Sequence, residues 1–337
     1  MPISRLAALL LALLVAACAP DLRLAGPPLA EQALNHDHWL AADGARLPVR
    51  SWLPEGGRPT AVVLALHGMN DYSNAFEGPG RFLAGKGIAV YAYDQRGFGQ
   101  GPHPGYWSDA ADMAADLRSA ARLVAARHSG VPLYLLGESM GGAVAILAAA
   151  DPPPEVKGLI LSAPAVWGRS QMGSLQRLAL WLATNTVPGW QLTGSGLRIL
   201  ASDNIEMLRA LSRDPLVLKA TRVDAINGLV DLMEVAYTTA ARLRLPTLVL
   251  YGERDEVIPP EPTWRMVEHL PELRTTPGSV SPQRVALYDK GWHMLLRDLG
   301  AEVVLSDVVA WIADPVQPLP SGADARALAE LAKRSSN

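Results

Sequence analysis

The sequence contains a single cysteine, Cys18, close to its start. Without a second thiol the mature chain cannot form an internal disulfide bond, and thiol catalysis and cysteine-based metal sites are excluded. The formal net charge is only −3 and the basic residues form no cluster, so the chain lacks the electrostatic footprint of a nucleic-acid-binding protein. Hydrophobic residues make up 49% of the chain, which is enough to build a sizeable core.

The N-terminal hydrophobic run is too short to cross a membrane. Residues 6–17 are apolar without interruption, but they span about 18 Å as a helix, against about 30 Å for the hydrocarbon core of a bilayer. The run follows Arg5, which gives the chain a short basic start. This arrangement is typical of an export signal, so we expect residues 1–17 to be a signal peptide.

Residues 15–18, with the sequence VAAC, resemble a bacterial lipobox. The pattern predicts that Cys18 becomes the lipid-modified first residue of the mature protein and anchors it to a membrane of the bacterial cell envelope, facing the periplasm. Ordinary signal cleavage near residues 17–19 is the alternative, and it would leave a soluble periplasmic or secreted protein. Residues 18–35 are rich in proline and alanine, and we expect them to form the lipidated tether.

Six predominantly apolar runs predict the strands of a mostly parallel sheet. They occupy residues 61–66, 88–93, 131–136, 158–164, 245–251 and 284–288. Such runs are typical of parallel strands buried on both faces. Helical segments lie between them, among them one that Asp109 should cap and that reaches His128. The pattern predicts an α/β fold with helices on both faces of the sheet and a ligand site at the carboxyl ends of the strands.

The alternation of strands and helices stops between residues 165 and 244, after the run at 158–164. We interpret this stretch as a helical cap, and the family resemblance described below places such a cap after the sixth strand of its fold. Apolar residues recur there at helical spacing: Leu175, Leu178, Ala179, Leu182, Ile226, Leu229, Val230 and Met233. We expect the cap to cover the carboxyl edge of the sheet. Trp167, Trp181 and Trp190 either line an acyl pocket or pack the cap against the body. The core then comprises residues 36–164 and 245–314, followed by a polar tail, residues 315–337, with a short helix at most.

Residues 137–142, with the sequence GESMGG, form a G-x-S-x-G motif between a strand and a helix. A turn tight enough to expose the serine needs glycines on either side, because a Cβ there would clash with the strand or the helix. The motif predicts Ser139 as a nucleophile and the Met140 N–H as an oxyanion donor. Met69, which follows the strand at residues 61–66, is the candidate for the second donor, and we expect His67 to brace that loop rather than to act as a base.

Two further residues complete a predicted catalytic triad. Asp255 follows the strand at residues 245–251 and is positioned to orient a histidine, whereas Glu253 and Glu256 are alternatives that we expect to face water. His293 follows the last strand and is the candidate general base. The order Ser, Asp, His along the chain is that of one class of α/β enzymes.

No cofactor or metal site is indicated. The glycines within residues 94–101 do not have the spacing of a dinucleotide fingerprint, and Asp94 and Arg96 are expected to form a structural ion pair. His36, Asp37 and His38 have no obvious third partner for a metal and are interpreted as an edge segment.

Together these stretches resemble the α/β-hydrolase fold and, within it, the monoacylglycerol lipase and lysophospholipase-like branch, which also contains serine aminopeptidase-like members. The resemblance rests on residues 67–70, 93–99, 137–142, 252–259 and 291–293. It implies a Ser139, His293 and Asp255 triad, an oxyanion hole formed by the N–H groups of Met69 and Met140, and a small-molecule acyl ester as substrate. A serine peptidase and a non-catalytic surface lipoprotein are the alternatives, and the intact triad argues against the second of these. The long cap argues against perhydrolase-like chemistry.

Overall fold

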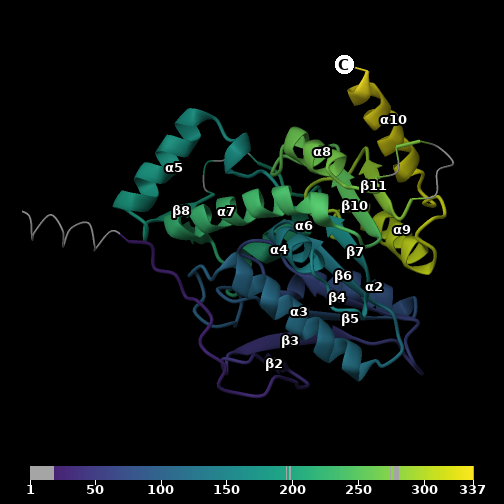
Figure 1. The fold of residues 1–337 in the computed structure, drawn as a ribbon, viewed down its shortest axis with the longest axis horizontal. Coiled ribbons are helices and arrows are strands. Elements are labelled where there is room, and N and C mark those ends of the chain that lie inside the picture. Colours follow the sequence, from purple (N-terminus) through teal and green to yellow (C-terminus); the bar gives the residue numbers. More distant parts are fainter. Residues whose placement is uncertain (1–18, 195, 197–198, 274, 277–280, 337) are drawn as a thin grey trace, which may run out of the picture.

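The computed structural model describes residues 19–336 except 195, 197–198, 274 and 277–280. Its centre is a nine-stranded sheet with the order β1-β2-β3-β5-β4-β6-β7-β10-β11 (Figure 1). The strands are β1 (Ala33–Leu34), β2 (His38–Leu40), β3 (Arg46–Trp52), β4 (Ala61–Leu66), β5 (Ile88–Tyr93), β6 (Leu133–Glu138), β7 (Val156–Ser162), β10 (Thr247–Gly252) and β11 (Gln283–Tyr288). The predicted signal peptide and Cys18 lie outside the described residues.

The sheet is antiparallel only at its N-terminal edge, where β1, β2, β3 and β5 pair in succession, and all other neighbours are parallel. Side chains of successive residues in a strand point to opposite faces, so the buried strand β4 contributes to two separate cores. Val62, Leu64 and Leu66 belong to one apolar cluster, whereas Val63 belongs to the other. The predicted mostly parallel sheet is confirmed.

Helices cover both faces of the sheet, as predicted. The body contains α2 (Glu77–Gly85), α3 (Ala110–Arg127), α4 (Met140–Ala149), α8 (Pro260–Glu268), α9 (Ala301–Ala313) and α10 (Ala323–Ser335). The apolar faces of α2 and α9 pack on one side, and those of α3, α4 and α8 on the other. Asp109 caps α3 as expected, because its side chain accepts the N–H of Ala111. None of the described helices is both long and apolar enough to span a membrane.

The cap lies between β7 and β10. It comprises α5 (Ser174–Thr186), α6 (Ile205–Arg213), α7 (Val223–Thr239) and a two-stranded antiparallel sheet of β8 (Gln191–Thr193) and β9 (Ala220–Arg222) that the sequence did not indicate. β7 is the seventh strand in chain order, so the cap follows the seventh strand and not the sixth as expected. The difference arises because β1 and β2, which were not predicted, extend the antiparallel edge of the sheet. Helix α7 packs on α4 and buries Val230 and Met233.

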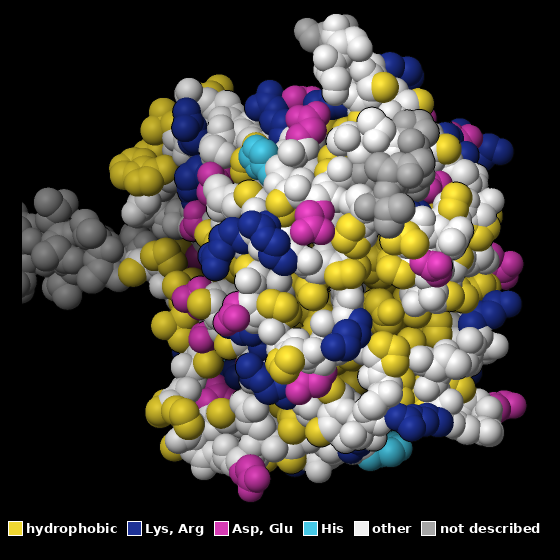
Figure 2. Space-filling view, turned by 45° about the vertical axis from the view of Figure 1, so that its right-hand side comes forward, with side chains coloured by type: hydrophobic (Ala, Val, Ile, Leu, Met, Phe, Trp, Pro, Cys, Tyr) yellow, Lys and Arg dark blue, Asp and Glu magenta, His cyan; other side chains and the backbone are white. Residues whose placement is uncertain are grey.

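Helix α5 departs from the expected packing. Its apolar residues Leu175 and Leu178 are 79% and 52% exposed, so the regular spacing marks an outer face of the cap instead of a buried one. In Figure 2 hydrophobic side chains stand out at the upper left, and basic and acidic side chains are interspersed over the face shown. The spacing of apolar residues predicted a helix there but not what the helix packs against.

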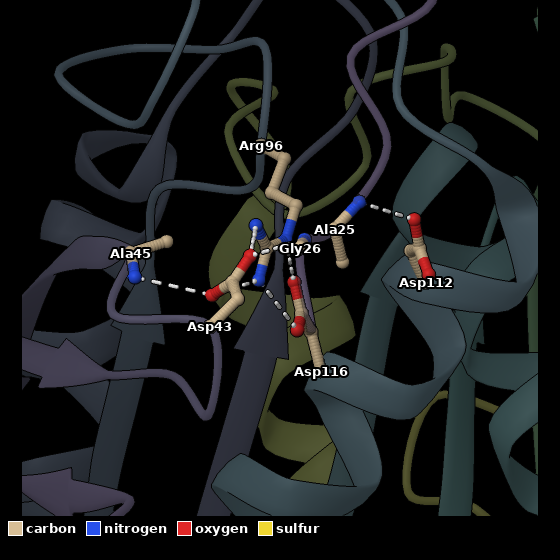
Figure 3. A network of polar contacts seen from close by, with 7 residues as sticks. All are labelled: Ala25, Gly26, Asp43, Ala45, Arg96, Asp112 and Asp116. Atoms are coloured by element: carbon tan, nitrogen blue, oxygen red, sulfur yellow. Dashed lines mark hydrogen bonds and ion pairs between the residues drawn. The ribbon is translucent and has the colours of Figure 1, made fainter. Parts of the chain in front are cut away.

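The segment after residue 18 runs along the body instead of standing free of it. The N–H groups of Asp21, Ala25 and Gly26 donate to Asp224, Asp112 and Asp43 respectively (the last two in Figure 3). These bonds join the segment predicted to be a tether to α7 of the cap, to α3 and to the loop between β2 and β3.

The expected ion pair between Asp94 and Arg96 is not formed, and that prediction was wrong. The guanidinium of Arg96 instead pairs with Asp43 at 2.7 Å and with Asp116 at 2.6 Å (Figure 3). Asp94 accepts the backbone N–H groups of Ser73 and Gln100. Partners distant in the sequence replaced the nearby one because the tertiary fold brings α3 and the β2–β3 loop to the guanidinium.

The C-terminal residues end in a helix of 13 residues, α10, where a polar tail with a short helix at most was expected. Ala327 and Leu331 of this helix are buried, and α10 packs on β11. Buried Arg284 of β11 lies 3.5 Å from Asp324 of the same helix. This segment therefore covers the outer strand of the sheet.

Candidate active site

Ser139 occupies a sharp turn between β6 and α4. Its φ of 53° and ψ of −117° are rarely adopted by residues that carry a Cβ. A Cβ added to Gly137 would lie 2.4 Å from the carbonyl oxygen of Gly141, and one added to Gly141 would lie 2.3 Å from that of Leu66. Packing therefore requires glycine at both flanking positions of the motif. The serine itself stays partly exposed.

The loop after β4 lies directly against this serine. A Cβ added to Gly68 would be 3.3 Å from the Cβ of Ser139, so the loop approaches closely because Gly68 has no side chain. Within the described part of the chain the N–H of the next residue, Met69, makes no hydrogen bond. Met140 is the first residue of α4, a position whose N–H has no partner within the helix. Both N–H groups predicted as oxyanion donors are thus available.

His67 braces the loop that carries Met69. Its Nδ1–H donates to the carbonyl of Gly68 at 2.8 Å, and its Nε2 accepts the N–H of Gln95 at 3.1 Å. The side chain of Gln95 in turn donates to the carbonyl of His67. Burial lowers the pKa of His67 below its ordinary value of 6.5, so the imidazole is held neutral. Both ring nitrogens are used by these bonds, which confirms the bracing role.

The structure brings Asp255 and His293 together. Nδ1 of His293 lies 2.9 Å from Oδ2 of Asp255, and both side chains are buried. The other carboxylate oxygen of Asp255 accepts the N–H groups of Val257 and Ile258 at 2.8 and 2.9 Å. The carboxylate is therefore held from both sides and fixes the orientation of the imidazole.

The two acidic alternatives near Asp255 do not contact the histidine. Glu253 and Glu256 are both exposed. A carboxylate oxygen of Glu256 accepts the N–H of Leu200 in the cap at 2.7 Å. Of the three carboxylates in this loop, Asp255 alone is positioned to orient His293.

Contact between two glycines aligns the loops that carry Asp255 and His293. A Cβ added to Gly252 would lie 2.4 Å from the carbonyl group of Gly291. The N–H of Arg254 also donates to the carbonyl of Gly291 at 3.0 Å. The ends of β10 and β11 therefore approach more closely than side chains would allow, and the acid and the base meet beyond them.

Ser139 Oγ and His293 make no hydrogen bond among the described residues. Catalytic hydrogen bonds are often long in ligand-free enzymes and shorten when substrate binds. Both residues lie at the carboxyl edge of the sheet, after β6 and β11 respectively. The arrangement at this edge combines a strained serine, available N–H donors and an imidazole oriented by a carboxylate, which together suit acyl transfer.

The three tryptophans proposed for an acyl pocket occupy different environments. Trp167 is partly buried and packs against the main core. Trp181 and Trp190 are 57% and 63% exposed. Exposure on this scale fits neither the lining of an enclosed pocket nor the packing of the cap against the body. The contact of Trp167 with the core agrees with the packing alternative.

Three charged residues beside the site were not predicted from the sequence. Arg297 pairs with Glu138 and with Asp71, each at 2.8 Å. Glu138 directly precedes Ser139, and its position in the motif was the one sequence signal that pointed to it. Arg297 and Asp71 belong to no sequence motif that would have identified them.

A family model described as serine aminopeptidase, S33, matches residues 57–300, which is most of the chain and includes every candidate triad residue. The chain belongs to the serine aminopeptidase S33 family. As an S33 family member it is a hydrolase of the α/β-hydrolase fold, in agreement with the resemblance found in the sequence.

Sequence relatives of this S33 family member include monoglyceride and monoacylglycerol lipases. It is 28% identical to the monoglyceride lipase of Mus musculus over 85% of this chain and 92% of that protein. It is 26% identical to the monoacylglycerol lipase of Mycolicibacterium smegmatis over 80% and 93% of the two chains. These relatives support a carboxylic ester hydrolase.

Solved structures agree on the fold. The monoacylglycerol lipase of Paleococcus ferrophilus superposes with a TM-score of 0.65 at 24% identity, covering 80% of this chain and 99% of that one. A soluble variant of the monoglyceride lipase of Saccharomyces cerevisiae, in complex with a substrate analog, gives 0.67 at 18% identity, with 87% and 97% coverage. At these identities the comparison establishes the α/β-hydrolase architecture alone.

Proposed function

We propose that this protein hydrolyses carboxylic esters of the acylglycerol or lysophospholipid type through an acyl-enzyme on Ser139. The observation that carries the proposal is the 2.9 Å hydrogen bond between His293 Nδ1 and Asp255 Oδ2. This bond places the proton on Nδ1 and leaves Nε2 free to accept another. A purely binding protein would not need a buried histidine oriented in this way.

The reaction proceeds in two steps. Nε2 of His293 removes the proton of Ser139 as Oγ attacks the ester carbonyl, and the N–H groups of Met69 and Met140 hold the resulting oxyanion. The C–O bond to the alcohol breaks, and the alcohol leaves with the proton from His293. Water, deprotonated by the same histidine, then attacks the carbonyl of the acyl-enzyme. The bond to Oγ breaks, the acid leaves, and His293 returns the proton to Ser139.

The substrate class rests on the relatives and on the cap. The named relatives act on monoglycerides or monoacylglycerols. A cap inserted between β7 and β10 would supply the apolar surroundings that an acyl chain needs. Peptide hydrolysis is the second candidate, because the matching family model is described as a serine aminopeptidase. Both reactions use the same triad and differ in the leaving group, an alcohol or an amine.

The experiment that tests this function is hydrolysis of p-nitrophenyl esters from acetate to palmitate by the full chain in detergent. We expect activity that peaks at medium or long chains and disappears in Ser139→Ala. Ser174→Ala, which changes an exposed serine at the start of α5, serves as the matched control and should keep full activity. No hydrolysis of any ester, together with cleavage of aminoacyl amides, would assign the protein to the peptidases.

The membrane anchor is part of the same proposal. The VAAC sequence that ends at Cys18 supports lipid modification of this residue and attachment to the bacterial envelope on its periplasmic side. We expect Cys18→Ala to move the protein from the membrane fraction to the soluble fraction of a bacterial host. A variant that still sediments with membranes would contradict lipid anchoring through Cys18.

A further inference from the structure

One buried guanidinium contacts the loops that carry three parts of the proposed catalytic machinery. Arg297 lies four residues after His293. Its Nη2 is 2.8 Å from Oε1 of Glu138, and its Nη1 is 2.8 Å from Oδ2 of Asp71. Glu138 immediately precedes Ser139 in the chain, and Asp71 follows the proposed oxyanion donor by two residues. Arg297 thus bridges the loops of the base, the nucleophile and the oxyanion hole.

Asp71 and Glu138 are each fixed to the backbone around them. Oδ1 of Asp71 accepts the N–H of Tyr72, and the N–H of Asp71 donates to Gly68, the residue packed against the serine. Glu138 ends β6, where it pairs with Ser162 of β7. A shift of either carboxylate would therefore displace backbone that forms the site.

Arg297 itself is held in the same turn as the base. Its backbone N–H donates to the carbonyl of Met294 at 2.8 Å, and its carbonyl accepts the side-chain amide of Asn204 at 3.0 Å. Met294, the residue next to His293, also donates its N–H to Ala201 of the cap. The position of the guanidinium and that of the imidazole are thus linked through one short turn.

Stability alone does not explain this cluster. The side chains of Arg297, Asp71 and Glu138 are only 9%, 8% and 2% exposed. Burial by itself would lower the pKa of Arg297, but attraction by Glu138 and Asp71 keeps the pKa above its ordinary value, so the guanidinium is charged. Replacing such buried ionic groups with apolar residues is often neutral or stabilising.

Both ion pairs of Arg297 join separate loops of the proposed site. One reaches the residue before Ser139, and the other reaches the loop that carries Met69. Neither pair links residues that are neighbours in the chain, which favours a role in the geometry of the site.

We propose that Arg297 is a positioning residue that sets the distance between Ser139, His293 and the Met69 N–H by bridging Glu138 and Asp71. The proposal rests on the function proposed above for Ser139. A displacement of about 1 Å in an active site can cost about 100-fold in rate. Loss of the bridge should therefore lower kcat strongly and change KM for the substrate only slightly.

The test compares Arg297→Lys, Arg297→Ala and Glu138→Gln with the unaltered full chain in detergent. Lysine keeps the charge but lacks the planar fork that reaches two carboxylates at once. Arg284→Lys is the matched control, because the Arg284 side chain is also enclosed by the protein but lies near the start of β11, at the opposite end from the site. The measurements are kcat and KM for a soluble p-nitrophenyl ester, the melting temperature, and the rate at which a fluorophosphonate labels Ser139.

We expect the Arg297 variants to lose about 10- to 100-fold in kcat and in labelling rate with KM nearly unchanged. Millimolar guanidinium should restore part of the activity of Arg297→Ala, and Arg284→Lys should keep its kcat. A normal kcat in Arg297→Lys and Glu138→Gln, or a loss of activity that follows only the loss of folded protein, would overturn the positioning role.

The labelling rate separates this proposal from the proposed function. An unaltered chain that hydrolyses no ester refutes the proposed substrate class, yet fluorophosphonate labelling of Ser139 still reports how well the serine and the base are aligned. Slower labelling in the Arg297 variants would then support positioning. Equal labelling rates in all variants would contradict it, whichever substrate the protein uses.

Discussion

Oδ2 of Asp255 lies 2.9 Å from Nδ1 of His293, while Oδ1 of the same carboxylate accepts the N–H groups of Val257 and Ile258. The carboxylate is thus fixed by its own loop before it orients the imidazole. An amide in its place would keep the shape of the side chain but would present a donor to the ring and favour the wrong tautomer.

We predict that Asp255→Asn lowers kcat for a p-nitrophenyl ester by roughly four orders of magnitude, the scale found when the triad carboxylate is neutralised. Glu253→Gln is the matched control, because Glu253 is an exposed carboxylate of the same loop. Steady-state kinetics of both variants measure the effect. Equal activity in Asp255→Asn and the unaltered chain would remove Asp255 from the triad.

The close approach of Gly68 to Ser139 gives a second prediction. A methyl group at residue 68 would lie 3.3 Å from the Cβ of Ser139 and would push the Met69 loop away from the serine. We expect Gly68→Ala to reduce kcat about 10- to 100-fold.

The control for this substitution is Gly85→Ala. Gly85 lies in α2, and a Cβ added there would meet no atom of the surrounding structure within 4 Å. We expect this variant to keep its kcat and to be slightly more stable, because alanine suits a helix better than glycine. Unchanged kinetics in Gly68→Ala would show that the loop does not need its close contact with the serine.

The buried imidazole of His67 should make the free energy of unfolding depend on pH. Burial lowers its pKa in the folded state, whereas the unfolded chain binds a proton near the ordinary value of 6.5. The unfolded state therefore takes up more protons below that value, so this contribution to stability is complete above pH 6.5 and is lost as the pH falls below it.

Urea unfolding at about pH 7.5 and about pH 5.5 measures this contribution. We expect His67→Gln, which cannot titrate, to lose less stability between the two conditions than the unaltered chain does. We compare how much the free energy of unfolding changes between the two pH values in each protein. The absolute free energies are not compared, because the substitution alters them at every pH. Identical pH dependence in both proteins would show that His67 does not carry the effect.

Local sequence patterns predicted the sheet and the elbow because their causes are local. The buried strand β4 is apolar throughout, and the glycines around Ser139 are needed by a turn that spans only a few residues. The helical spacing of Leu175 and Leu178 correctly indicated a helix. It did not indicate whether that face is buried, because burial depends on which distant segments of the chain pack against the helix.

Long-range pairing of charges escaped prediction for the same reason. Arg96 was matched with the nearby Asp94, but the fold offers it Asp43 and Asp116. Arg297 meets a carboxylate that precedes it by 159 residues, and no local pattern marks such a contact. The N-terminal segment and α10 were likewise judged by composition, whereas their hydrogen bonds and apolar contacts attach them to the body.

The most direct test of the account is to trap the acyl-enzyme. The full chain is mixed with a p-nitrophenyl ester, quenched in acid within the first turnover, and digested for mass spectrometry. We predict an added acyl mass on the peptide that contains Ser139, together with a burst of p-nitrophenolate equal to the amount of enzyme, both absent in Ser139→Ala. An acyl group on another residue, or full hydrolysis by Ser139→Ala, would contradict the proposed mechanism.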